Sequence, residues 1–89
     1  MILSWTKNGW ADYLYWQTAD RPMTKRVNAL VLETMRSPFT GIGKPEPLKG
    51  DYAGCWSRRI DSEHRLIYRV SGVGDGQTLL IYACRHHYG

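Results

Sequence analysis

Hydrophobic spacing divides the chain into a helical first half and a strand-rich second half. Residues 1–5 form a short apolar run that predicts an opening strand. A helix can begin near residues 6–8, where Thr6 or Asn8 would cap it. An aromatic-rich stripe then recurs at helical spacing, and we expect it to face the core: Trp10, Tyr13, Leu14, Trp16 and Gln17.

A second helix is expected after a break at Asp20. Asp20 can cap this helix, and Pro22 suits its first turn, where the missing N–H would be unpaired anyway. Ser37 and Pro38 end it, because the residue before a proline disfavours helical backbone. Its apolar stripe falls on one helical face and consists of Met23, Val27, Leu30, Val31 and Thr34. The first half therefore predicts strand, helix and helix.

The second half contains one long loop followed by three strands. Residues 39–54 are rich in Gly and Pro and predict an ordered loop. Strands are expected over residues 55–60, 64–70 and 78–85, joined by a tight hairpin at 61–63 and a looser connection at 71–77. Short connections favour antiparallel neighbours. The predicted fold class is α+β, with two N-terminal helices packed on an antiparallel sheet in one domain spanning residues 1–89.

Alternation assigns the two faces of the middle strand. The set expected to meet the helices is Leu66, Tyr68 and Val70, and the set expected to face away is Arg65, Ile67 and Arg69. In the last strand, His87 shares its alternation with Ile81, Ala83 and Arg85, although alternation is a weak guide near a strand end. The predicted outer face of the middle strand therefore carries two arginines, Arg65 and Arg69.

Charge and composition narrow the range of partners. The formal net charge is +4, which favours an anionic partner such as nucleic acid, an acidic protein or a membrane surface. No run of about 18 apolar residues exists, and the N-terminus lacks the layout of a secretion signal, so no membrane span is expected. Cys55 and Cys84 are interpreted as two buried thiols of a protein in a reducing cytosol, not as a disulfide framework.

The second half also gathers residue types that can perform acid–base chemistry. Pro45 and Pro47 stiffen the backbone on both sides of Glu46. Adjacent His86 and His87 would point to opposite faces of a strand, so we expect no metal site. No phosphate-binding glycine loop or nucleophile elbow is present. Cations cluster in the same half: Lys44, Lys49, Arg58, Arg59, Arg65, Arg69 and Arg85.

A carboxylate, an imidazole and guanidinium groups can together cleave RNA without a metal or another cofactor. A base takes the proton from the 2′-hydroxyl, which attacks the adjacent phosphate, and an acid protonates the leaving 5′ oxygen. Fixed cations stabilise the charge on the phosphorane, and arginine suits phosphate oxygens better than lysine does. These residue types occur in most proteins, so on their own they leave RNA cleavage as one hypothesis among several.

Five segments, in order along the chain, carry a more specific signal. They are residues 10–16 (WADYLYW), 43–49 (GKPEPLK), 56–60 (WSRRI), 63–68 (EHRLIY) and 83–88 (ACRHHY). Together they resemble the YoeB toxins (also called Txe) of the RelE superfamily, over essentially the whole chain. The resemblance implies a microbial-ribonuclease-like fold in a bacterial cytoplasmic toxin that cleaves mRNA in the ribosomal A site. It also implies a YefM-type antitoxin, a homodimer, and contact with operator DNA only through the antitoxin.

The resemblance assigns roles to individual positions. Glu46 would be the general base and His87 the general acid. Arg65 would stabilise charge on the phosphate, and Tyr88 would position the substrate or stack on it. With Arg58 added from the cation cluster, the predicted phosphate-binding set is Lys44, Lys49, Arg58 and Arg59.

The chain departs from the family pattern at three places, and two alternative functions stay open. The connection at residues 71–77 is longer than is typical, His86 stands where an aromatic residue is usual, and Gly89 follows Tyr88. One alternative is a non-catalytic basic module that binds its antitoxin and co-represses the operon. The other is a nuclease that cuts free RNA without the ribosome.

Overall fold

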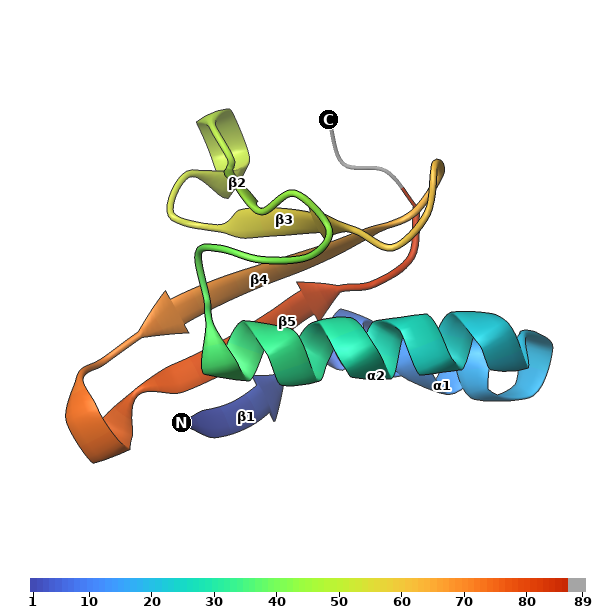
Figure 1. The fold of residues 1–89 in the computed structure, drawn as a ribbon, viewed down its shortest axis with the longest axis horizontal. Helices are drawn as coiled ribbons and strands as arrows, with labels where there is room; N and C mark the ends of the chain where they lie inside the picture. Colours follow the sequence, from blue (N-terminus) through green and yellow to red (C-terminus); the bar gives the residue numbers. More distant parts are fainter. Residues whose placement is uncertain (87–89) are drawn as a thin grey trace.

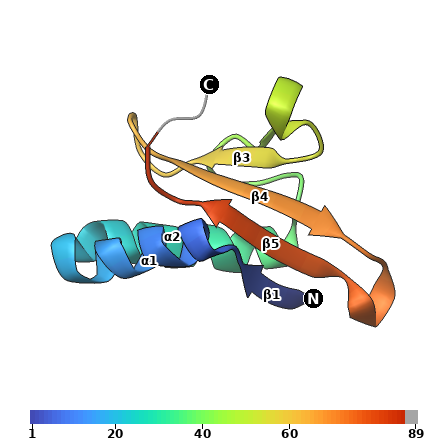
Figure 2. The same cartoon turned by 180° about the vertical axis from the view of Figure 1, so that it is seen from behind.

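The structure, a computed structural model, describes residues 1–86 and consists of two helices packed on one face of a five-stranded sheet (Figures 1 and 2). Its order is β1 (Ile2–Trp5), α1 (Lys7–Ala19), α2 (Arg21–Arg36), β2 (Glu46–Pro47), the short 3-10 turn η1 (Gly50–Tyr52), β3 (Trp56–Arg59), β4 (Arg65–Ser71), η2 (Gly74–Gly76) and β5 (Thr78–Ala83). The predicted architecture of two helices on a sheet is therefore confirmed.

The strands lie in the order β1-β5-β4-β3-β2. Neighbours from β2 to β5 are antiparallel, as predicted, but β1 runs parallel to β5, with Ile2 opposite Thr78 and Trp5 opposite Ile81. The sheet is thus mixed and not purely antiparallel. Parallel pairing is possible here because the two helices lie between β1 and the rest of the sheet in sequence and give the chain room to cross over.

Both helices begin where their caps were expected. The Thr6 hydroxyl accepts from the Gly9 amide at 3.0 Å, and the Asp20 carboxylate accepts from the Met23 amide at 3.1 Å. The whole predicted stripe of α2 is buried, from Met23 to Thr34, and it packs against Leu66, Tyr68, Leu79 and Ile81 of the sheet. The amphipathic pattern of α2 therefore predicted its buried face correctly.

The predicted buried face of α1 is wrong for most of its members. Trp10 is 46% exposed and Leu14 is 45% exposed, whereas the buried residues of α1 are Gly9, Asp12 and Trp16. The helix lies against the backbone of β5, so the contact surface requires a small residue and hydrogen-bonding side chains in place of large apolar ones. Trp10 instead packs against neighbouring aromatic rings, edge to face with Trp5 and tilted against Tyr13, with its centroid 5.7 Å from each of theirs.

The two faces of β4 are as predicted, but alternation fails in β5. Leu66 and Tyr68 belong to the core beneath the helices, whereas Ile67 belongs to a second cluster on the opposite face. A register shift pairs Ile67 with Ala83 and Tyr68 with Ile81, so β5 contains one extra residue at this point. Consequently Ile81 lies on the helix face and Ala83 on the other, and the alternation count that linked His87 to both residues no longer applies.

Both cysteines are free and buried, as expected. Burial raises the pKa of Cys55, and burial together with the charge of Asp12 raises the pKa of Cys84 to about 12. Neither thiol is therefore prepared to act as a nucleophile near neutral pH. Within residues 1–86, no helix is long and apolar enough to cross a membrane.

The close approach of α1 to β5 predicts a large effect of one added methyl group. A Cβ at Gly9 would lie 2.4 Å from the backbone oxygen of Ile81, so Gly9→Ala must separate the helix from the strand. We expect a loss of about 1–3 kcal/mol in the free energy of unfolding, measured by urea denaturation. Gly76→Ala is the control, because a Cβ there meets nothing within 4 Å. Equal stability of the Gly9 variant and wild type would contradict this account.

Candidate active site

Three strands, β2, β3 and β4, bring Glu46, Arg59 and Arg65 onto the sheet face that lies away from the helices. Glu46 pairs with Ser57, Ser57 pairs with Ile67, and Ile67 pairs with Ala83. Arg59 pairs with Arg65 one position farther along the same face. Because residues directly opposite each other in a ladder share a face, Glu46, Arg59 and Arg65 lie on the same side of the sheet.

The loop that carries Glu46 is held on both sides by β3. The Arg59 amide donates to the Gly43 carbonyl at 2.6 Å, and the Leu48 amide donates to the Cys55 carbonyl at 2.9 Å. Glu46 itself is exposed, in a two-residue strand between these two attachments. The loop is therefore ordered, as its prolines predicted, and it presents the carboxylate to solvent at a fixed position beside β3.

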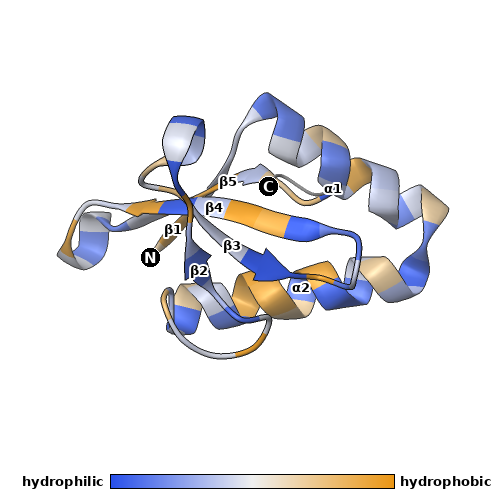
Figure 3. Cartoon of the chain, turned by 90° about the horizontal axis from the view of Figure 1, so that it is seen from above, coloured by the Kyte–Doolittle hydropathy of each residue, from blue (hydrophilic) through white to orange (hydrophobic). Residues whose placement is uncertain are grey.

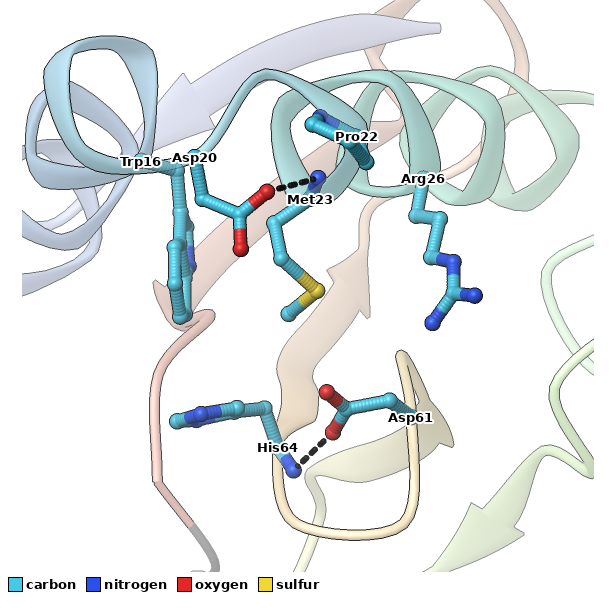
Figure 4. Close-up of a pocket in the computed structure, with 7 residues that line it drawn as sticks. All are labelled: Trp16, Asp20, Pro22, Met23, Arg26, Asp61 and His64. Carbon is cyan, nitrogen blue, oxygen red and sulfur yellow. Dashed lines mark hydrogen bonds between the residues drawn. The ribbon is translucent and has the colours of Figure 1, made fainter.

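Arg65 is anchored at the start of β4 by the preceding turn. Its guanidinium Nη1 donates to the Asp61 carbonyl at 3.1 Å and to the His64 carbonyl at 3.3 Å. The Asp61 carboxylate closes the turn by accepting from the Glu63 and His64 amides at 2.8 and 2.7 Å, and Figure 4 shows the second of these bonds. Arg65 is half-buried and is held by backbone carbonyls, which leave its remaining N–H groups available.

The prediction that Arg58 binds phosphate does not agree with its position. Arg58 is fully buried (0% exposed), because alternation places it opposite Leu66 on the helix face of β3. Its guanidinium donates to the carbonyls of Ile42 and Thr40 at 3.0 and 2.9 Å and also to that of Ser37. The side chain therefore fastens the segment after α2 to the sheet and is not accessible to a ligand.

Tyr68 completes this buried arrangement. Its hydroxyl accepts from Arg58 Nε at 3.2 Å and donates to the Pro38 carbonyl at 2.6 Å. Burial raises the pKa of Tyr68, although the neighbouring Arg58 acts in the opposite direction, so the hydroxyl keeps the proton that it donates.

The remaining predicted phosphate-binding residues are exposed. Lys44, Lys49 and Arg59 all lie at the surface, on or beside the loop and strand that carry Glu46. In the view of Figure 3, β2 and the end of β3 are hydrophilic, whereas the middle of β4 is hydrophobic. These three exposed cations therefore lie on the same loop as Glu46 or on the strand that pairs with it.

The two C-terminal site residues, His87 and Tyr88, lie outside the described residues. The chain that leads to them is described as far as His86, whose carbonyl accepts from the Arg65 amide at 3.0 Å. The sequence patterns assigned no role to His64, which is buried and whose Nδ1 accepts from the His86 amide. The one sequence feature that could have indicated a role for His64 is its position directly before Arg65 in the motif at residues 63–68. Within residues 1–86, no three His, Cys, Asp or Glu side chains are grouped so as to hold a metal.

Comparison with known proteins decides the family. The model of the YoeB-like toxin of bacterial type II toxin-antitoxin systems matches residues 5–88. The chain is 52% identical to toxin YoeB of Escherichia coli K12, over 99% of this chain and 100% of that protein. The chain belongs to the YoeB toxin family.

Solved structures of YoeB proteins agree with this assignment. A YoeB/ParE toxin from Agrobacterium tumefaciens is 55% identical, with a TM-score of 0.94 over 99% of this chain and all of that one. YoeB of Staphylococcus aureus, in a heterotetrameric YoeB-YefM toxin-antitoxin complex, is 38% identical, with a TM-score of 0.83 over 99% of this chain and 98% of that one. The chain is thus a toxin of the type II toxin-antitoxin class.

The opposite environments of Arg58 and Arg59 give a matched pair of variants. Arg58→Met removes a fully buried side chain that donates to three backbone carbonyls, so we expect a loss of about 3 kcal/mol in the free energy of unfolding. Arg59→Met, at the surface, should change that free energy by less than about 0.5 kcal/mol. Urea denaturation of both variants measures the difference, and similar losses for the two would contradict the assigned roles.

The turn before Arg65 predicts a pH dependence of stability. Partial burial acts to raise the pKa of Asp61, but the amides of His64 and Glu63 and the nearby His64 and Arg26 charges outweigh it and lower that pKa below its usual 3.8. The carboxylate therefore stabilises the fold above pH 3.8, and this stabilisation is lost as pH falls through the lower folded-state pKa.

Asp61→Asn should therefore lower the urea midpoint at pH 6, and the difference from wild type should shrink below about pH 4. Asp75→Asn, in the exposed turn η2, is the control and should follow wild type throughout. A difference for the Asp61 variant that stays constant with pH would show that the charge of the carboxylate does not contribute.

Proposed function

We propose that the chain is a ribosome-dependent endoribonuclease that cleaves mRNA in the ribosomal A site and thereby inhibits translation. The observation that carries the proposal is the strand register, which brings Glu46, Arg59 and Arg65 onto one sheet face. On that face Glu46 and Arg59 are exposed and Arg65 is half-buried. Membership of the YoeB family supports the same conclusion. The alternative of a non-catalytic module is less favoured, because the loop holds the Glu46 carboxylate at the surface and the turn before β4 holds Arg65 on the same face.

Each residue then has one task in the reaction. Glu46 takes the proton from the 2′-hydroxyl, and the resulting oxygen attacks the adjacent phosphorus to give a pentavalent phosphorane. Arg65 stabilises the negative charge on that intermediate. His87 donates a proton to the 5′ oxygen as the P–O bond breaks, leaving a 2′,3′-cyclic phosphate and a free 5′-hydroxyl. Tyr88 positions the substrate. No step of this scheme calls on a metal ion.

The surrounding cations hold the RNA backbone. Lys44, Lys49 and Arg59 are exposed around Glu46 and would bind phosphates on either side of the cleaved bond. Contacts of this kind depend on counterion release, so they strengthen binding without reading the base sequence. Presentation of the codon would then fall to the ribosome.

We further propose that the chain is neutralised by a YefM-type antitoxin, forms a homodimer and contacts operator DNA only through the antitoxin. The Staphylococcus aureus structures of a YoeB dimer and of a YoeB-YefM complex support the first two points. The site of action would be the bacterial cytoplasm, where ribosomes translate mRNA.

Cleavage of mRNA on programmed ribosomes tests the enzymatic proposal. Glu46→Gln and His87→Gln should each slow cleavage by roughly 10²–10⁴-fold, because each removes one proton-transfer group. Asp75→Asn is the control, a carboxylate-to-amide change at an exposed turn remote from the site. Products are mapped by primer extension.

Three results would contradict the proposal in different ways. Undiminished cleavage by both variants would remove Glu46 and His87 from the mechanism. No cleavage and no inhibition of translation by wild type would favour the binding module. Efficient cutting of naked RNA at a low enzyme-to-substrate ratio would instead favour a nuclease that does not need the ribosome.

A further inference from the structure

We propose that His64 is a positioning residue for RNA cleavage, acting by holding the backbone of His86. His86 immediately precedes His87 in the chain, so the conformation at His86 sets the direction from which the chain continues to the proposed general acid. This inference rests on the proposed function, because it assigns His64 a part in the reaction that His87 performs.

The imidazole of His64 is fixed at both nitrogens. Its Nδ1 accepts a hydrogen bond from the His86 amide at 2.7 Å, so Nδ1 carries no proton in this arrangement. Its Nε2 lies 3.0 Å from the Glu63 carboxylate, to which an N–H on Nε2 can donate. The tautomer is thus determined by its two neighbours, as is common for histidines with a structural or catalytic part.

His86 needs such a constraint because its backbone is in the left-handed region, with φ of +70°. An L residue with a side chain pays a steric penalty there, and such residues persist only where the surroundings determine them. Both backbone groups of His86 are used: the N–H donates to His64 Nδ1, and the carbonyl accepts from the Arg65 amide at 3.0 Å. Two consecutive residues of one motif therefore determine this conformation.

Side chains of α1 hold the residues just before His86. The Cys84 amide donates to Asp12 at 3.1 Å, and the Cys84 carbonyl accepts from Trp16 Nε1 at 2.7 Å. The Arg85 guanidinium lies over the ring of Tyr15, at 3.5 Å from its centroid. Each of residues 84–86 is thus held by a side chain from another part of the fold. His64 supplies the contact at His86, the residue before His87.

His64 is itself held in a well-defined place. It is only 9% exposed, and its ring meets the ring of Trp16 edge to face at a centroid distance of 4.8 Å. Figure 4 shows His64 and Asp61 on the turn, across a pocket from Trp16, Asp20, Met23 and Arg26 of the helices. The same turn binds the Arg65 guanidinium through the Asp61 and His64 carbonyls. It therefore positions the phosphate-stabilising arginine together with the chain that leads to the general acid.

Three substitutions separate the hydrogen bond from the packing of the ring. His64→Phe keeps a ring against Trp16 but has no acceptor for the His86 amide. His64→Asn loses the ring, yet its side-chain oxygen can occupy the place of Nδ1. His64→Gln has the same amide one methylene farther out, where it corresponds to Nε2. The three variants therefore differ in whether an acceptor reaches His86.

We expect His64→Phe and His64→Gln to cut mRNA on programmed ribosomes roughly 10–100-fold more slowly at saturating ribosomes, because misplacement of a catalytic group by about 1 Å has effects of this size. The half-saturating ribosome concentration should not change. His64→Asn should keep most of the activity although it is less stable to urea than the Phe variant. If the Phe variant does not fold, the Asn and Gln pair decides the matter.

A spectroscopic measurement tests the hydrogen bond separately from activity. In wild type, the imidazole ¹⁵N shifts of His64 should report a proton on Nε2 and none on Nδ1, and the His86 amide should exchange slowly with solvent. Exchange should be faster in the Phe and Gln variants and close to wild type in the Asn variant. Tyr13→Phe, which removes a hydrogen bond to Asn28 between the helices, is the control for loss of one contact and should leave cleavage unchanged.

The outcomes distinguish this inference from the proposed function. Wild-type cleavage together with equal rates for the Phe, Gln and Asn variants would overturn the positioning role alone. Rates that follow stability, with the Asn variant slowest, would overturn it in favour of a purely structural His64. A wild-type protein that leaves ribosome-bound mRNA intact would overturn the proposed function, and the positioning role with it.

Discussion

The rest of the structure depends on the hydrogen bonds that α1 and its N-cap make to the backbone at the irregular end of β5. The Ile81 carbonyl accepts from the Thr6 amide at 2.9 Å, and the Tyr82 carbonyl accepts from the Thr6 hydroxyl at 3.1 Å. Farther along, Asp12 and Trp16 bind the amide and carbonyl of Cys84. Buried peptide groups must find partners, and a bulged strand cannot obtain all of them from its neighbour in the sheet. The helix α1 and its N-cap therefore supply the hydrogen-bond partners that the strand pairing does not.

This contact determines the direction in which the chain leaves the sheet. The extra residue near Tyr82 reverses the alternation of β5, so Ala83 joins the outer face while Cys84 returns to the core beneath the helices. From there the chain passes the Asp61–His64 turn and the start of β4, where Arg65 lies. The described chain thus ends beside Arg65 at the start of β4, where His86 is held through its backbone amide and carbonyl.

Local sequence patterns predicted the buried face of elements that pack against an apolar layer. They failed for elements whose placement depends on the backbone of a neighbouring strand. The stripe of α2 and the faces of β4 meet an apolar layer, so periodicity was sufficient for Val27, Leu66 and Ile67. The stripe of α1 was misassigned because nothing local to Trp10 shows that β5 approaches Gly9 so closely. The parallel pairing of β1 was missed because the pattern of an edge strand does not specify its partner's direction.

The site was predictable to a similar degree. The order of the loop around Glu46 followed from its prolines, and the five motifs indicated the family. Arg58 and Arg59 were grouped because they are adjacent cations, yet alternation on β3 gives them opposite environments. That distinction requires the pairing of Arg58 with Leu66, which depends on strand register. His64 was overlooked because its partner is a backbone amide, and no residue-type pattern encodes such a contact.

The distribution of charge in the fold fits a surface that binds a polyanion. Among residues 1–86, no lysine or arginine forms an ion pair with a carboxylate, and the one such contact links Glu63 to His64. The Arg58 guanidinium donates to backbone carbonyls, and the Arg85 guanidinium lies over an aromatic ring. The exposed cations around Glu46 are left without carboxylate partners, which costs some stability through mutual repulsion. A phosphate backbone would relieve that repulsion while displacing its own counterions, so the same charges that weaken the isolated fold would strengthen its complex with RNA.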